Sequence, residues 1–283
     1  MLRELRYSSL LQGTIRRALQ EDIGQGDITS FLIIPEEREA GARLIAKEDF
    51  ILAGMPFVEE VFRVIDPAVR VTAHMPEGFA VKEGDIIAEI AGRARSLLAG
   101  ERVSLNLLQR VSGIATLTHS FVERVKDLPV KITDTRKTVP GMRLMEKYGV
   151  RMGGGANHRF GLFDGILIKD NHIEVAGGVK EAVLRARKGH HLLKIEVEVR
   201  NGDEVKEALE AGADIIMLDN MSLSAMAEAV RFVQGKALLE ASGNVRLETV
   251  RSIAETGVDI ISVGALTHSA RAADISMKIL YSS

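Results

Sequence analysis

The second half of the chain contains short runs of apolar residues, each of which stops abruptly at charged, amide or glycine residues. Runs of this length without alternation are typical of strands buried on both faces, as in a parallel sheet covered by helices. The six runs lie at residues 130–133, 165–168, 192–197, 215–218, 237–239 and 260–262. We therefore predict six parallel strands in this part of the chain.

The polar residues that follow these runs recur at regular intervals. From Lys169 to Glu198, Asp219, Ser242 and Gly264 the steps are 29, 21, 23 and 22 residues. Each step has room for one strand, one helix and their loops, so the pattern favours repeated βα units. The polar ends of parallel strands lie at one edge of the sheet, which in an α/β barrel carries the active site. We expect the functional site at that edge.

Helical spacing of apolar residues separates the runs. We predict helices at residues 178–188, 203–211, 223–233, 246–256 and 271–280. Asn201 and residues 242–244 precede two of these helices as candidate N-caps, and Gly212 and Gly257 stand where a left-handed C-terminal residue is needed. Residues 150–152 are a candidate seventh strand. With six clear strands, an open barrel is as compatible with the pattern as a closed one with eight strands.

The pattern changes before residue 100. We predict short, half-exposed strands at residues 43–47, 69–73 and 86–90, and helices at 10–20 and 56–64. Strands that are grouped together, with helices set apart from them, are typical of an α+β domain.

A long stretch of helical apolar spacing at residues 101–126 predicts a helix that bridges the two parts of the chain. We place an α+β domain at residues 1–105 and expect the C-terminal helix, residues 270–283, to join it. The α/β barrel is expected to be the catalytic domain, over residues 106–269.

Composition limits the classes of function. The 283 residues are 46% hydrophobic and 27% charged, as in an ordinary globular protein, and the net charge of −2 gives no support to a nucleic-acid or anionic-membrane partner. The absence of cysteine excludes disulfides, thiolate metal sites and a cysteine nucleophile. The N-terminal residues lack the apolar segment of a signal peptide, and no apolar run approaches the ~18 residues of a membrane span. We expect a cytoplasmic protein.

Cationic side chains gather after the first strands. Arginine binds carboxylates and phosphates through two parallel hydrogen bonds, and lysine acts as a compact charge. Cations that converge without nearby carboxylates repel each other unless an anion lies between them, although solvated surface charge is the alternative. The candidate anion-binding residues are Thr135, Arg136, Lys137, His158, Arg159 and Lys169.

Two acids end consecutive strands. Glu198 and Asp219 are expected to reach one ligand, where carboxylates can hold Mg²⁺, accept hydrogen bonds from sugar hydroxyls or stabilise developing positive charge. Glu196 precedes Glu198 by two residues and should share its side of the strand, deeper in the barrel. The alternative is an ion pair with Lys169 or Arg159, which is compatible with a binding role because an empty site pairs its own charges.

Glycine-containing segments follow the last two strands. Glycine lets backbone N–H groups approach a ligand, and barrels often bind phosphate after their last two strands. Two ordinary turns are the alternative. The candidate phosphate-binding residues are Ser242, Gly243, Asn244, Val263, Gly264 and Ala265.

Nearly the whole chain resembles the quinolinate phosphoribosyltransferase family. The resemblance lies in ordered blocks at residues 21–29, 99–106, 133–140, 153–159, 168–172, 196–198, 217–220, 240–244 and 263–269. It implies an N-terminal α/β domain, an incomplete barrel and at least a homodimer. The implied reaction converts quinolinate and phosphoribosyl pyrophosphate into nicotinate mononucleotide, pyrophosphate and CO₂ in NAD synthesis, with Mg²⁺ as cofactor.

The same resemblance implies roles for individual residues. Quinolinate carboxylates would be held by Arg136, Arg159 and Lys169, with Arg102 reaching the site of a neighbouring subunit. Lys137 and His158 would help to bind the substrate anions. Glu198 and Asp219 would bind the ribose hydroxyls with Mg²⁺ and stabilise the transition state, and residues 242–244 and 263–265 would bind the 5′-phosphate. The catalytic residues implied are Glu198, Asp219, Lys137 and Lys169.

Three other functions compete with this one. A related protein encoded with molybdenum transporters is expected to depart from the blocks at residues 169–172 and 242–244, which are intact here. A Schiff-base aldolase would use Lys169 as its nucleophile. A non-catalytic anion receptor has no use for the acids Glu198 and Asp219.

Overall fold

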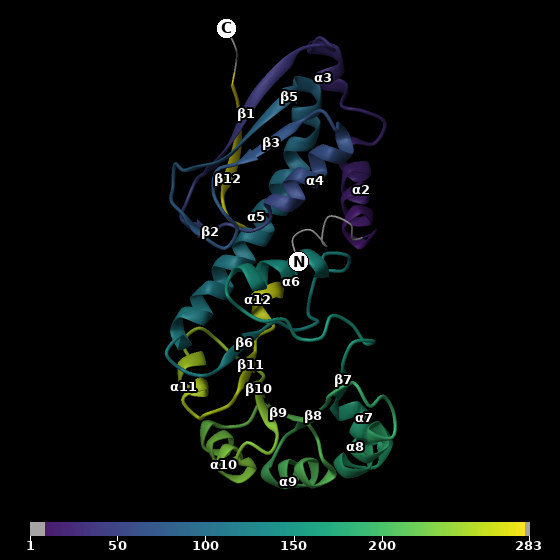
Figure 1. Ribbon diagram of the computed structural model, residues 1–283, viewed down its shortest axis with the longest axis vertical. Coiled ribbons are helices and arrows are strands. Elements are labelled where there is room, and N and C mark those ends of the chain that lie inside the picture. The colour runs from purple at the N-terminus through teal and green to yellow at the C-terminus, as the bar shows by residue number, and fades with distance from the viewer. Residues whose placement is uncertain (1–8, 281–283) are drawn as a thin grey trace. The chain divides into compact units, whose positions relative to one another are not determined.

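The computed structural model describes residues 9–280, which form two compact units (Figure 1). Of the described residues, unit 1 contains those up to Leu117, residues 138–154 and those from Ser269 onward, and unit 2 contains residues 118–137 and 155–268. The division falls inside helix α5 (Ala94–Val125), the long helix expected from the sequence. The boundary between the units thus lies after Leu117 and not after residue 105 as predicted. The prediction also did not include residues 138–154 in the first unit.

Unit 2 contains one parallel sheet, whose strand order is β6-β11-β10-β9-β8-β7. Its strands are β6 (Lys131–Thr133), β7 (Ile166–Ile168), β8 (Ile195–Val199), β9 (Ile215–Asp219), β10 (Leu238–Ser242) and β11 (Ile260–Ser262). They curve into an arc in which β6 and β7 are the two ends and do not pair with each other (Figure 1). The six predicted strands and the incomplete α/β barrel are confirmed.

Helices of unit 2 lie on the outer side of this arc (Figure 1). They are α7 (Asp170–Ala176), α8 (Val179–Arg187), α9 (Gly202–Ala211), α10 (Leu223–Val233) and α11 (Val250–Ala254). The short helix α12 (Ala265–His268) follows β11. The Asn201 side chain caps α9 by accepting hydrogen bonds from two backbone N–H groups, and Gly212 ends that helix with a φ of 83°, as predicted. The N-cap expected at residues 242–244 was wrong, because α11 begins only after Thr249.

Unit 1 is built on an antiparallel sheet with the order β12-β1-β5-β3. The strands are β1 (Glu39–Ala46), β3 (Arg70–Ala73), β5 (Ile86–Arg93) and β12 (Ile275–Leu280), and β2 (Phe50–Ile51) pairs separately with β4 (Ala80–Val81). Besides the first part of α5, its helices are α2 (Ser9–Ile23), α3 (Ile28–Ile33), α4 (Met55–Ile65) and α6 (Arg143–Met152). Leu44, Phe62 and Leu108 are fully buried in the core between the sheet, α4 and α5.

Two predicted elements have the wrong secondary structure. Residues 275–280 of the predicted C-terminal helix form strand β12, because Ile275, Met277 and Ile279 alternate with polar residues and pair with β1. Residues 281–283 of that prediction lie outside the described residues. Residues 150–152 end helix α6 and form no seventh strand. Helix α6 and the short elements α3, α7, α12, β2 and β4 were not predicted from the sequence.

The segment that leads into β12 is fixed to helix α5 within unit 1. The backbone N–H of Ala273 donates to the carbonyl oxygen of Gln109 (2.9 Å), and the Gln109 side chain donates to the carbonyl oxygen of Ile275 (2.8 Å). A Cβ atom on Gly113 would lie only 1.9 Å from the carbonyl oxygen of Arg271, so this close approach requires glycine. Among residues 9–280 no helix has the length and apolar character needed to cross a membrane.

Candidate active site

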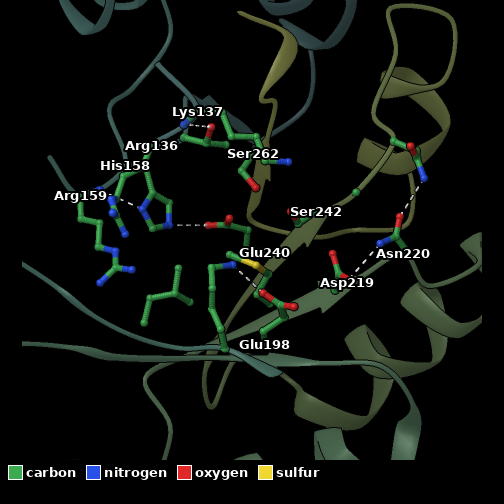
Figure 2. Close-up of a pocket in the computed structure, with 16 residues that line it drawn as sticks. Arg136, Lys137, His158, Arg159, Glu198, Asp219, Asn220, Glu240, Ser242 and Ser262 are labelled. Atoms are coloured by element: carbon green, nitrogen blue, oxygen red, sulfur yellow. Dashed lines mark hydrogen bonds and ion pairs between the residues drawn. The ribbon is translucent and has the colours of Figure 1, made fainter. Parts of the chain in front are cut away.

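A cavity of about 430 Å³ lies at the carboxyl ends of the unit 2 strands (Figure 2). Eleven of the residues singled out in the sequence line it: Thr135, Arg136, Lys137, His158, Arg159, Lys169, Glu198, Asp219, Ser242, Gly243 and Asn244. Figure 2 shows Arg136, His158 and Arg159 on one side of the cavity and Asp219 and Asn220 on the other. The charges are therefore separated into a cationic side and an acidic side.

The cationic side is organised by a buried aspartate. Asp134, which is fully buried directly after β6, accepts hydrogen bonds from the backbone N–H of His158 (3.0 Å) and the side chain of Asn157 (2.5 Å). These two hydrogen bonds hold the segment that contains Arg159 beside the segment after β6 that contains Arg136. Burial, together with the nearby charge of Arg136, lowers the pKa of Arg159 below its usual value. The positive charges of Arg136 and Arg159 repel each other, and an anionic ligand between the two guanidinium groups would offset this repulsion.

Lys169 and Glu198 form an ion pair at the ends of β7 and β8. The Nζ atom of Lys169 donates to Oε2 of Glu198 at 2.7 Å, and the Glu198 side chain is only 11% exposed. The alternative left open by the sequence, an ion pair between these residues, is thus present. A ligand that carries both an anionic group and hydroxyl groups could separate the pair and contact both partners.

The acidic side continues into a chain of amides. Asn220 donates from Nδ2 to Oδ2 of Asp219 (2.9 Å) and accepts at Oδ1 from Asn244 (3.0 Å). Asn220 and Asn244 both have left-handed backbones, with φ of 52° and 50°. Gly243 also has a positive φ, 94°, and a Cβ atom there would lie 2.2 Å from Oδ1 of Asn220. The loop after β10 therefore requires glycine at position 243. Hydrogen bonds through Asn220 connect this loop to Asp219 on β9.

Below the cationic side lies a buried cluster of His158 and two glutamates. Nε2 of His158 is 3.0 Å from Glu196 and 3.6 Å from Glu240, and the two glutamates are 5% and 1% exposed. Glu196 thus shares the inner face of β8 with Glu198, as expected. Burial and the charge of Glu196 raise the pKa of Glu240 to about 7, although His158 and the Ser262 hydroxyl act in the opposite direction.

Four predicted residues lie outside the cavity wall as it is formed by the described residues. Val263 is buried, and its backbone N–H donates to the carbonyl oxygen of Thr133 (2.9 Å). A Cβ atom on Gly264 would lie 3.1 Å from Cδ of Lys137, which places this glycine behind Lys137. Ala265 is the first residue of α12. Arg102 is exposed on α5 and belongs to unit 1.

The prediction also missed several lining residues: Leu167, Met217, Asn220, Glu240 and Ser262. Three of them, Leu167, Met217 and Glu240, stand two positions before a polar strand end that was identified. Because side chains two apart in a strand share a face, this spacing was the signal that could have identified them. The register supports the argument, since Met217 pairs with Glu198 on one side and with Glu240 on the other.

Two sets of side chains offer donor atoms for a cation. Glu198 and Asp219 offer carboxylate oxygens beside the open cavity, which are the hard donors that Mg²⁺ prefers. His158, Glu196 and Glu240 offer one nitrogen and two oxygens within 4.8 Å of one another in a buried position. That second set is more typical of transition metals than of Mg²⁺.

Family models match almost the whole chain in two parts. The model of the quinolinate phosphoribosyl transferase N-terminal domain matches residues 27–112, and that of the C-terminal domain matches residues 114–278. The chain is 46% identical over 263 residues to a probable nicotinate-nucleotide pyrophosphorylase (carboxylating) of Bacillus subtilis, with 93% of this chain and 91% of the relative covered. It is 44% identical over 289 residues to a quinolinate phosphoribosyltransferase (decarboxylating) of Nicotiana tabacum, covering 95% and 82%.

A solved structure agrees with these relatives. The nicotinate-nucleotide pyrophosphorylase of Francisella tularensis superposes with a TM-score of 0.92 at 44% identity, and 96% of each chain is covered. Both domains, the order of the blocks and the fold thus agree with one family. This chain belongs to the quinolinate phosphoribosyltransferase family.

Proposed function

We propose that this chain transfers the phosphoribosyl group of phosphoribosyl pyrophosphate to quinolinate and releases CO₂ and pyrophosphate. The product is nicotinate mononucleotide, an intermediate of NAD synthesis. The observation that carries the proposal is the separation of Arg136 and Arg159 from Asp219 across one cavity. A substrate pair with a dicarboxylate at one end and a ribose phosphate at the other matches that distribution of charge.

The cationic side provides the dicarboxylate subsite in this proposal. Arg136 and Arg159 bind quinolinate carboxylates through paired hydrogen bonds, and Lys169 contributes a point charge after it separates from Glu198. Thr135 and Lys137 follow β6 directly and complete the subsite for the substrate anions. The apolar side chains of Leu167 and Met217 line the same cavity and suit the faces of a pyridine ring.

The acidic side provides the ribose subsite. Glu198 and Asp219 accept hydrogen bonds from the ribose hydroxyls and stabilise the positive charge that develops at the sugar carbon as pyrophosphate departs. The same carboxylates fit Mg²⁺, because they are oxygen donors on neighbouring strand ends beside an open cavity. When bound, Mg²⁺ supplies charge neutralisation of the pyrophosphate.

The 5′-phosphate subsite lies after β10. Ser242 and Gly243 offer a hydroxyl and an accessible backbone, and Asn244 is held against Asn220. Val263, Gly264 and Ala265 contribute backbone around the phosphate in this proposal, and Gly264 lies against the side chain of Lys137.

The reaction needs no protein nucleophile. The ring nitrogen of quinolinate attacks the sugar carbon, the carbon–oxygen bond to pyrophosphate breaks, and the ring nitrogen becomes positively charged. The adjacent carboxylate then leaves as CO₂, and its electron pair is taken up by the cationic ring until a proton replaces it. The chain contributes by holding the two reactants in reacting position and by its fixed charges.

A Schiff-base aldolase is a weaker explanation of the same site. That chemistry needs an uncharged lysine amine with a proton-transfer partner. Lys169 instead donates to the Glu198 carboxylate at 2.7 Å, so this lysine is engaged in an ion pair. The acids are equally hard to explain in a simple anion receptor, because they repel an anionic ligand.

We also propose a homodimer or a higher homo-oligomer, in which Arg102 of one subunit completes the dicarboxylate subsite of another. The resemblance of the block at residues 99–106 supports this, as does the exposure of Arg102 on α5. A cytoplasmic location is part of the proposal and is supported by the absence of cysteine, which is compatible with a reducing compartment.

The proposed function is tested by product analysis. Purified protein with Mg²⁺ and phosphoribosyl pyrophosphate is given either quinolinate or nicotinate, and nicotinate mononucleotide is measured. We expect product from quinolinate and much slower turnover of nicotinate, which lacks the second carboxylate that Arg136 and Arg159 are suited to bind. No product from quinolinate, or faster turnover of nicotinate, would refute the assignment.

A further inference from the structure

Asn220 lies in the cavity between Asp219 and the loop after β10 (Figure 2). Its side-chain Nδ2 atom donates a hydrogen bond to Oδ2 of Asp219 at 2.9 Å, and its Oδ1 atom accepts one from Asn244 at 3.0 Å. Its backbone N–H donates to the carbonyl oxygen of Ser242 at 2.9 Å. One residue therefore connects the acid at the end of β9 to the residues on either side of Gly243.

The backbone at Asn220 has a conformation that most side chains disfavour. Among residues 9–280, the non-glycine residues with a positive φ are Asn220 (52°), Gln234 (51°) and Asn244 (50°). Gln234 ends helix α10, where a left-handed residue is an ordinary way to finish a helix. Asn220 and Asn244 instead contact each other through their amides beside the cavity. Such conformations persist where the surrounding contacts hold them, and they are concentrated at functional sites.

The amide of Asn220 packs on the backbone of Gly243. A Cβ atom on Gly243 would lie 2.2 Å from Oδ1, 2.5 Å from Cγ and 2.8 Å from Nδ2 of Asn220. All three atoms of the amide group therefore occupy the space that a side chain at position 243 would need. Because Asp219 and Asn244 engage the two polar atoms of the same amide, its orientation is fixed. The spacing between the acid and the loop is fixed with it.

We propose that Asn220 is a positioning residue for the phosphoribosyl donor. Its amide holds Asp219 and the loop after β10 at the spacing of the ribose hydroxyls and the 5′-phosphate of one donor molecule. Oδ2 of Asp219 accepts the hydrogen bond from this amide, so we assign Oδ1 to the ribose. This inference rests on the proposed function, because it takes the phosphoribosyl group to be the ligand of the acidic side.

The place of Asn220 in the cavity predicts which kinetic constants depend on it. Figure 2 shows Asn220 on the opposite side of the cavity from Arg136 and Arg159, the residues assigned to the dicarboxylate. A displaced Asp219 stabilises the developing positive sugar carbon less well, so donor binding and the chemical step should both suffer. The binding of quinolinate should be nearly unchanged.

An Asn220→Gly variant tests the proposal, because glycine adopts the left-handed backbone and only the amide is lost. KM for each substrate and kcat are measured with the other substrate saturating. We expect KM for phosphoribosyl pyrophosphate to rise roughly five- to tenfold and kcat to fall roughly tenfold, with KM for quinolinate within about twofold. Gln234→Gly is the matched control, since it places glycine at the left-handed residue that ends α10. It should behave like the unaltered protein.

A double-mutant cycle tests the connection between the two amides. Asn244 also has a left-handed backbone, so Asn244→Gly is tolerated for the same reason. Because the two amides bond to each other, removing both should cost less than the product of the two single losses. We expect the rise in KM for phosphoribosyl pyrophosphate in the double variant to be roughly three- to tenfold smaller than that product.

The outcomes separate this inference from the proposed function. Absence of quinolinate turnover in the unaltered protein refutes the function itself. Normal turnover, with unchanged kinetic constants in Asn220→Gly, overturns the role of Asn220 alone. An equal rise of both KM values in Asn220→Gly would show a merely structural contribution and would also overturn it. Losses that simply multiply in the double variant would contradict the connection between Asn220 and the loop.

Discussion

Asp219→Asn is expected to lower kcat about 100- to 1,000-fold, with little change in the free energy of unfolding. The substitution keeps the shape of the side chain and removes only the charge that stabilises the developing positive sugar carbon. Asp219 receives a hydrogen bond from Asn220, and an amide oxygen can still accept it. Steady-state kinetics with both substrates saturating, together with a denaturant unfolding curve, provide the measurement.

Glu198→Gln provides the companion experiment. It should also reduce kcat strongly, and it deprives Lys169 of its carboxylate partner, so KM for quinolinate should change as well. Glu228→Gln on α10 is the matched control and should retain full activity. Retention of kcat within threefold by both Asp219→Asn and Glu198→Gln would contradict the role assigned to the acidic side.

Arg102→Ala and Arg159→Ala are each expected to lower kcat/KM for quinolinate about 100-fold, because each removes a charged partner of a carboxylate. If Arg102 enters the site of the neighbouring subunit, a mixed dimer contains one intact site and one site with both substitutions. Random exchange in an equal mixture makes half of the dimers mixed, so about a quarter of the original activity should return. The activity of the mixture is measured after subunit exchange has been verified with labelled chains.

Arg124→Ala serves as the control for Arg102, because Arg124 is another exposed arginine of α5. It should leave kcat/KM unchanged, and its mixture with Arg159→Ala should show only the activity of its own intact sites. A mixture of Arg102→Ala and Arg159→Ala that stays inactive despite proven exchange would argue against a shared site.

Secondary structure was predicted best where burial on both faces of a strand requires a continuous run of apolar residues. Strands β6 to β11 are buried on both faces, so their apolar runs were recognised and their parallel arrangement followed. The C-terminal segment was misjudged because Arg271, Ala272 and Ala273 favour a helix. The pairing of Met277 with Leu44 on β1 is a long-range contact that local spacing reveals only through its alternation. Helix α6 was missed for a related reason, as its return to unit 1 is a tertiary event.

For the site, the strand ends were identified from the sequence. The lining residues two positions earlier in the same strands were overlooked. Asp219 was assigned to the site because it ends an apolar run, whereas Glu240, which directly follows the run at residues 237–239 and also stands in a family block, was given no role. Asn220 was overlooked because its role depends on contact with Asn244, 24 residues away. No spacing pointed to Arg102, since its partner in the proposal is another subunit. Groups whose role depends on contacts across the fold were thus the ones that sequence reasoning could not supply.

The central claim is that one cavity couples phosphoribosyl transfer to loss of a carboxylate. The direct measurement supplies quinolinate labelled in the carboxyl group next to the ring nitrogen and follows labelled CO₂, pyrophosphate and nicotinate mononucleotide together. We predict that all three form in equal amounts and only when phosphoribosyl pyrophosphate is present. Release of CO₂ without phosphoribosyl pyrophosphate, or of pyrophosphate without CO₂, would contradict the account.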